Sequence, residues 1–202
     1  DAGGGDVTAI AENNTKSKTI ANAVQVASDP KNPPKVGVGV AFALDKITNR
    51  AEAGLQDNVT LTNGGKLTLT ATSDNSSETS VTTGSAGNIS VSPSVALNIV
   101  SNATIASIGT GSLLTVKSVE ASATHKGSTT ASADGAAAGG KVGLGAALSF
   151  NFVNDTTTST TGRDITATEG DVSFGAFAYA NSSASAKASV SGTEAAKDDS
   201  ET

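Results

Sequence analysis

A ten-residue segment recurs three times along this 202-residue chain, and this recurrence limits the possible folds more than any other feature. The segment reads VGVGVAFALD from Val36, ISVSPSVALN from Ile89 and VGLGAALSFN from Val142, and the start positions give 89 − 36 = 53 and 142 − 89 = 53. Equal steps without a gap indicate an internal repeat, which is the signature of stacked or arrayed units. We therefore expect a succession of similar units.

Each copy alternates large apolar residues with very small ones. A period of two is the pattern of a β-strand with one buried face, whereas a helix would spread the large side chains around its circumference. We interpret the large residues as core columns, with Leu44, Leu97 and Phe150 forming one buried row. The predicted core columns are Val36, Val38, Phe42, Leu44, Ile89, Val91, Val95, Leu97, Val142, Leu144, Leu148 and Phe150.

The opposite face of the segment carries Gly, Ala and Ser instead of charged residues. Because Gly and Ser weaken an isolated strand, their use implies that something approaches this face closely. Two candidates stay open: a neighbouring segment of the same chain, or another molecule packed laterally. The column Asp45, Asn98 and Asn151 lies at the end of this face and predicts a ladder of stacked amide side chains.

The period divides the chain into units. We expect a partial repeat with a Pro-rich loop at residues 1–34, repeats at 35–87, 88–140 and 141–193, and a charged tail or linker at 194–202. Asn, Gly and Ser favour bends, which predicts a corner near Thr48 and Asn49 within the first unit. The predicted fold is all-β, a β-solenoid (parallel β-helix) with two coils of about 26 residues per repeat. One wide coil per repeat and an array of β-sandwiches are the alternatives.

Charge and composition exclude several classes of protein. The formal net charge is −6 and the pI is near 4.7, which argues against nucleic acid as a partner. The chain has no cysteine, so neither a disulfide framework nor a thiolate metal site can form. No apolar run is long enough to cross a bilayer as a helix, and we expect no membrane insertion.

Residues that could carry chemistry are sparse. His125 is the only histidine, and without cysteine it cannot anchor a zinc site alone, so we expect it on the solvated surface. A Ser-His-Asp arrangement is formally possible, but no local motif frames a nucleophile. The calcium-binding nonapeptide of some β-helices is also absent from the sequence. We therefore expect no catalytic residue, no cofactor and no metal site.

The run VGVGVAFALD-KITNRAEAGL, followed by a GGKLTLTA-type strand, resembles the repeats of giant secreted bacterial adhesins. These are haemagglutinin-like, fusobacterial leukotoxin-like β-helical surface proteins. The second copy follows that pattern best, with Ala96-Leu97-Asn98, whereas the third departs from it at Ser149-Phe150-Asn151. The resemblance implies a β-helical stalk or filament at the bacterial cell surface, and it brings no catalytic residues with it.

Three functions follow as hypotheses. The first is a structural segment of an extracellular stalk, adhesin or filament, without catalysis, whose partners are neighbouring copies or repeats of the chain and host-cell or surface glycans. The second is a ligand-binding β-helix for glycan or ice. An ice face needs Thr in successive ranks, but Thr68 and Thr70 align with Glu120 and Ser122. The third, a pectin-lyase-type enzyme, needs a cleft rich in aromatics, and the chain has only five Phe and one Tyr.

Overall fold

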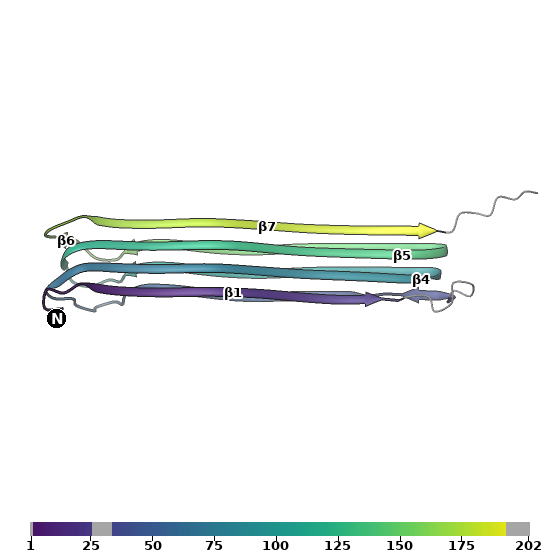
Figure 1. Ribbon diagram of the computed structural model, residues 1–202, viewed down its shortest axis with the longest axis horizontal. Coiled ribbons are helices and arrows are strands. Elements are labelled where there is room, and N and C mark those ends of the chain that lie inside the picture. The colour runs from purple at the N-terminus through teal and green to yellow at the C-terminus, as the bar shows by residue number, and fades with distance from the viewer. Residues whose placement is uncertain (1, 26–33, 193–202) are drawn as a thin grey trace, which may run out of the picture.

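The computed structural model describes residues 2–25 and 34–192, and within these ranges the chain forms long β-strands and no helix (Figure 1). The all-β prediction is confirmed, and the parallel sheet of long strands is compatible with a β-helix. Most of the expected Pro-rich loop and the charged tail fall outside the described residues. The strands are β1 (Val7–Val24), β2 (Val36–Val38), β3 (Ala41–Leu55), β4 (Gly64–Ile108), β5 (Leu114–Thr161), β6 (Ile165–Ala167) and β7 (Val172–Gly192).

The two longest strands, β4 and β5, fold back on themselves, which gives the molecule two layers (Figure 1). The fold in β4 coincides with a register shift between Gly87 and Ile89. On either side of it the hydroxyl groups of Ser85 and Ser90 lie 2.6 Å apart. We call this end of the body the turn end. The opposite end, where loops join β3 to β4 and β4 to β5, is the loop end.

The front layer consists of β1, the first halves of β4 and β5, and β7, and the back layer consists of β2, β3 and the second halves of β4 and β5. The described strands pair in parallel, and partners lie about one repeat apart. Val36 pairs with Ile89, and Ile89 pairs with Val142, so each step between partners is one full repeat. Among the described strands no pairing joins positions half a repeat apart. The prediction of two coils per repeat is therefore wrong: one passage out and back uses a whole repeat.

The face of the recurring segment that packs inward is the small one. Ala43 is 3% exposed and Ala96 and Ser92 are 0% exposed, whereas Val36 and Phe42 are 55% and 57% exposed. The prediction that the large residues form the core is therefore wrong. Nine of the twelve point into solvent: Val36, Val38, Phe42, Leu44, Ile89, Val142, Leu144, Leu148 and Phe150. The other three, Val91, Val95 and Leu97, are half-buried.

This inversion has a simple cause, which is that no corner exists near Thr48 and Asn49. The strand β3 continues from Ala41 to Leu55, so one alternation of side chains applies along its whole length. At the loop end that alternation places Ala51 and Ala53 inside, each 3% exposed. The same parity then turns Leu44 outward and Asp45 inward. Leu44, Leu97 and Phe150 still stack in register, but on the outer surface.

The small face lets the two layers approach closely, as the sequence predicts. A Cβ added to Gly39 would lie 2.4 Å from the carbonyl oxygen of Gly84 in the other layer. A Cβ on Gly135 would lie 2.5 Å from the carbonyl oxygen of Ala146 and 2.6 Å from that of Ser92. Of the two candidates left open by the sequence, a segment of the same chain is the one that packs against this face.

The interior holds two apolar clusters with polar side chains between them, and at the turn itself it is polar again, where Ser85, Ser90 and Ser92 are buried. The loop-end cluster is the larger and contains Leu67, Leu69, Ile108, Leu114, Val116 and Val119. The turn-end cluster is built mainly from alanine and contains Ala43, Val81, Ala96, Ala131 and Ala133. His125, Asn102 and Asp155 lie in the stretch between the two clusters.

Candidate functional site

A ladder of two amide side chains and one carboxyl group, which we call the amide ladder, crosses the interior between the two apolar clusters. Asn49 Nδ2 donates to Asn102 Oδ1 at 2.8 Å, and Asn102 Nδ2 donates to Asp155 Oδ1 at 2.6 Å. These residues lie 53 positions apart on paired strands, so each repeat contributes one rung. Thr15 Oγ1 donates to Asn49 Oδ1 at 3.0 Å and extends the ladder to β1.

His125 lies beside this ladder and is 0% exposed. Its Nδ1 is 2.6 Å from Ser73 Oγ, and Ser73 Oγ is 2.6 Å from Thr104 Oγ1. Its Nε2 is 3.4 Å from Asp155 Oδ2. The prediction of a solvated surface histidine is wrong. His125 shares the inward parity of Ala121 and Ala123 on β5, and that parity is a signal the sequence contains.

Ser73, His125 and Asp155 therefore meet, but their surroundings do not suit nucleophilic catalysis. A catalytic serine must present its Oγ to a substrate carbonyl and have oxyanion donors beside it. Ser73 is 2% exposed, and its hydroxyl is already in contact with Thr104. The His125 Nε2 has no hydrogen-bond partner. A substrate could reach this group only if the two layers separated.

The predicted column Asp45, Asn98 and Asn151 is in register and faces inward, but its members are linked differently. Ser77 Oγ lies 2.9 Å from both Asp45 Oδ2 and Asn98 Oδ1, so a hydroxyl bridges the first two residues. Asn151 Nδ2 instead donates to the carbonyl oxygen of Thr129 at 3.0 Å. The direct amide ladder is the neighbouring column of Asn49, Asn102 and Asp155.

We expect Asn102→Leu to lower the free energy of unfolding by about 3 kcal/mol or more. The change removes the acceptor of Asn49 and the donor to Asp155, and a buried polar group left without a partner costs about 1–3 kcal/mol, more if charged. Urea titration measures the loss. Ser101→Leu, on the outward side of the same strand, is the control and should stay within about 0.5 kcal/mol of the unmodified chain. Equal stability of Asn102→Leu and this control would contradict the role of the ladder.

Arg163 is a residue that no sequence pattern singled out. It is 8% exposed and joins three successive loops at the loop end. Its Nε donates to the carbonyl oxygen of Gly109 at 2.6 Å, and Nη1 donates to that of Val59 at 2.7 Å. Nη2 donates to the carbonyl oxygens of Gln56 and Thr110. The guanidinium thus satisfies four main-chain acceptors that no strand pairs. The only signal for Arg163 in the sequence is that arginine is rare, since the chain has two arginines.

Asp57 connects two of the same loops. Its Oδ1 accepts the backbone N–H of Thr110 at 2.6 Å and the Thr110 hydroxyl at 2.9 Å. The backbone hydrogen bond, followed by the hydroxyl bond, lowers the pKa of Asp57 below its ordinary value of 3.8. The two residues lie 53 positions apart, so the loops stack with the same period as the strands.

Arg163→Ala should reduce the free energy of unfolding by about 3 kcal/mol, because hydrogen bonds from a charged donor contribute about 1.5–3 kcal/mol each and their losses overlap. Arg163→Lys should recover only part of this, since an ammonium group cannot reproduce the planar fork. Arg50→Ala is the matched control: Arg50 pairs with Glu52 on the surface, a contact worth about 0–1 kcal/mol. Thermal melts that shift equally for both alanine variants would contradict the assignment.

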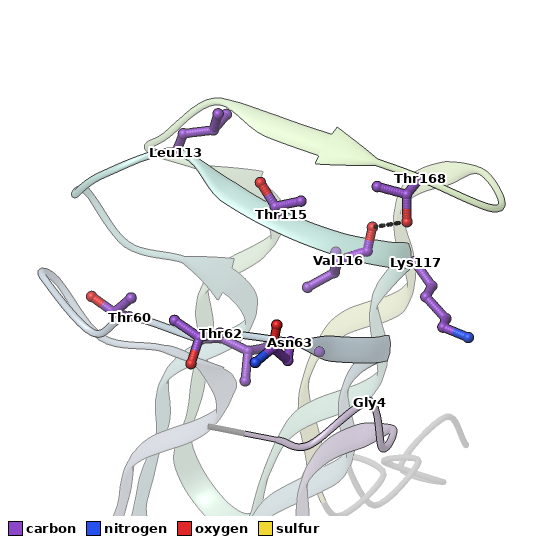
Figure 2. Close-up of a pocket in the computed structure, with 11 residues that line it drawn as sticks. Gly4, Thr60, Thr62, Asn63, Leu113, Thr115, Val116, Lys117 and Thr168 are labelled. Atoms are coloured by element: carbon purple, nitrogen blue, oxygen red, sulfur yellow. Dashed lines mark hydrogen bonds between the residues drawn. The ribbon is translucent and has the colours of Figure 1, made fainter.

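A hollow of about 540 Å³ opens at the loop end between two successive loops (Figure 2). The hydroxyl-bearing residues Thr60, Thr62 and Thr115 line it, and Leu113 covers one side. Lys117 also lines it, but its ammonium group pairs with Glu169 at 3.1 Å. No aromatic residue or pair of carboxyl groups lines this hollow. Its chemistry therefore suits weak hydroxyl contacts and not acid–base catalysis.

Across residues 2–25 and 34–192, no group of three or more His, Asp or Glu residues is placed to hold a metal ion. The same part of the chain contains no helix able to span a membrane. Comparison of the chain with protein-family models, with curated proteins and with solved structures found no match.

Proposed function

We propose that this chain is a non-catalytic structural segment of an extracellular bacterial stalk, adhesin or filament. In this proposal each repeat forms one wide coil of a β-solenoid. The observation that carries the proposal is the pairing register. From β1 to β7 the strands pair in parallel with partners about one repeat away, and in the recurring segment Val36 lies beside Ile89 and Leu97 beside Phe150.

The placement of reactive side chains supports the same proposal. His125 contacts Ser73 and Asp155 between the layers, and these buried groups are not presented to a substrate. The outer surface of the front layer is mainly polar on β4 and the first half of β5, and the salt bridge between Lys18 and Glu78 joins β1 to β4 there. Such a body is suited to holding a fixed length and shape.

The extracellular location rests on two features of the sequence. The absence of cysteine is compatible with an exported protein. The repeats resemble those of secreted adhesins, and this resemblance implies a location at the cell surface. A glycan- or ice-binding role has less support, because Thr72 pairs with Thr124 but Thr124 pairs with Phe177, so the Thr rank ends within three strands.

Immunogold electron microscopy of the source cells, with antibodies raised against this chain, tests the proposal. We expect gold particles along fibres or stalks outside intact cells, in equal number before and after permeabilisation. A cytoplasmic protein of the same cells, labelled in parallel, shows that intact cells exclude the antibody. Labelling that appears only after permeabilisation would overturn the extracellular assignment.

A further inference from the structure

The outer surface of the back layer carries a block of large apolar side chains at the turn end. It consists of the outward residues of three segments, 36–44, 89–99 and 142–152, and we call it the apolar patch. Its most exposed members are Val36, Val38, Val40, Phe42, Leu44, Ile89, Val142, Leu144, Leu148, Phe150 and Phe152, each between 44% and 61% exposed. Val91, Val95, Leu97 and Ile99 are half-buried between them.

Strand pairing makes the patch continuous. Phe42 pairs with Val95 and Val95 pairs with Leu148, so apolar residues form rows across all three strands. No outward position in the three segments carries a charge. Beyond the patch the same face becomes polar: Lys46 follows it on β3, then Arg50 paired with Glu52.

The area of the patch is large for a surface left in water. Eleven residues of strand extend about 36 Å, and three strands at about 4.8 Å spacing extend about 14 Å, which gives about 500 Å² in projection. Monomeric proteins rarely expose apolar patches larger than a few hundred Å² unless the patch binds something. Two such patches together bury about 1,000 Å², which reaches the lower limit for a specific protein interface.

Two partners have a flat surface that could cover the patch: a lipid bilayer and a second copy of the chain. The charged residues that lie beyond the patch on the same sheet face favour the second copy. Arg50 and Glu52 lie in the same sheet face as the patch. A lipid bilayer lying against this face would have to remove water from that charged half as well. A second copy of the chain can overlap the patch alone and leave both polar halves in water. A pleated sheet with the same side-chain spacing also interdigitates with its own copy about 10 Å away.

We propose that two copies of this chain pack apolar patch against apolar patch around a two-fold axis. The axis lies in the interface, perpendicular to the strands, so the turn ends overlap and the loop ends point in opposite directions. Residue contacts across such an interface are reciprocal, as in other closed dimers. The body of one copy is about 66 Å long, and the staggered pair is about 100 Å long.

Light scattering after size-exclusion chromatography tests the mass, and small-angle X-ray scattering tests the length. We expect twice the chain mass of 19.6 kDa and a maximum dimension of about 100 Å. The variant Phe42→Glu with Leu148→Glu should weaken self-association about 100-fold, because each partner then buries two charges. A milder pair, Phe42→Thr with Leu148→Thr, suits strands and should weaken it about tenfold even if the Glu variant fails to fold.

The matched control is Ile10→Glu with Ile20→Glu. These two residues are 64% and 53% exposed on β1 in the front layer, so the change in charge and hydropathy is similar. The control should dimerise like the unmodified chain. A monomeric unmodified chain at all concentrations, or equal dissociation by the control and patch variants, would overturn the proposal. Monomer that binds neutral phosphatidylcholine vesicles would overturn it in favour of lipid as the occupant.

Discussion

A chain that lacks residues 88–114 is expected to lose its cooperative unfolding transition, whereas a chain that lacks residues 88–140 is expected to keep one. The longer deletion removes one whole period of the repeat, and the shorter deletion removes about half of one. If strands pair only with strands one full repeat away, the longer deletion should disturb the fold less than the shorter one. Circular dichroism melts and urea titrations of the two variants measure the difference.

The geometry at the new joints explains this order. In the longer deletion Gly87 is followed by Lys141 and Val142, which replace Asn88 and Ile89. Since Val36 pairs with Ile89, and Ile89 with Val142, Val142 can take the vacated position beside Val36. In the shorter deletion Gly87 is followed by Thr115. Gly87 lies at the turn end and Thr115 at the loop end, about 66 Å away along a strand.

The longer deletion should fold with lower stability, because one unit and one interface between units are lost. The slope of its unfolding free energy against urea concentration should also be smaller, because the shorter chain exposes less surface when it unfolds. A third variant, lacking residues 101–153, joins Val100 to Asn154 in mid-strand and again removes one whole period. It should also fold, which separates the effect of the period from that of the joint. Similar unfolding of all three variants would refute the proposed coil and favour an array of sandwiches.

Gly135→Val is expected to destabilise the chain by about 3 kcal/mol or to prevent folding. The Cβ of the new side chain would lie within 2.6 Å of two carbonyl oxygens of the back layer, those of Ala146 and Ser92. Overpacking a close-packed interior costs about 1–3 kcal/mol and occasionally more, and main-chain atoms of a paired strand can yield little. Urea titration measures the loss if the variant folds.

Ala136→Val is the matched control because residue 136 is the next position on the same strand and is exposed. Valine has a higher strand propensity than either glycine or alanine, so the local effect of both changes is favourable and only the side of the sheet differs. The control should stay within about 0.5 kcal/mol of the unmodified chain. A well-folded Gly135→Val would mean that the layers are farther apart than the structure places them.

The repeat was visible in the sequence because pairing between repeats preserves residue type. The alternation within the segment predicted the strand class. The step from Val36 to Ile89 to Val142 is also the step between paired residues, but the prediction of two coils per repeat missed this register. The close approach of the small face could likewise be predicted, because glycine in a strand suggests a close neighbour. The repeat and the small face could both be found by comparing one segment with its two copies.

The direction of the large face could not be found that way. Large and small residues alternate in all three copies except at Pro93 and Ala146, but the segment itself does not show which face is inside. The alternation along the rest of the same strand decides it. Asn49 suggested a bend because asparagine is common in turns, yet it is a rung of the interior ladder. A corner at Asn49 would allow Ala53 and Leu44 to face inward together. In the continuous strand they lie on opposite faces. His125 was misplaced for a related reason, since its neighbours Lys126 and Gly127 are polar or small.

The one-repeat pairing register also determines the order in which the chain can acquire structure. The first pairing, of β1 with β4, joins positions somewhat more than one repeat apart, and each later pairing joins positions about one repeat apart. Closing a loop of about 53 residues costs roughly 3.5 kcal/mol of chain entropy before any strand contact compensates. Once β1 and β4 are joined, every later strand adds to an existing edge. The first closure is therefore the slow nucleus, and on a ribosome it cannot begin until Leu67, the partner of Val7, has been synthesised, nor be complete before Gly84, the partner of Val24.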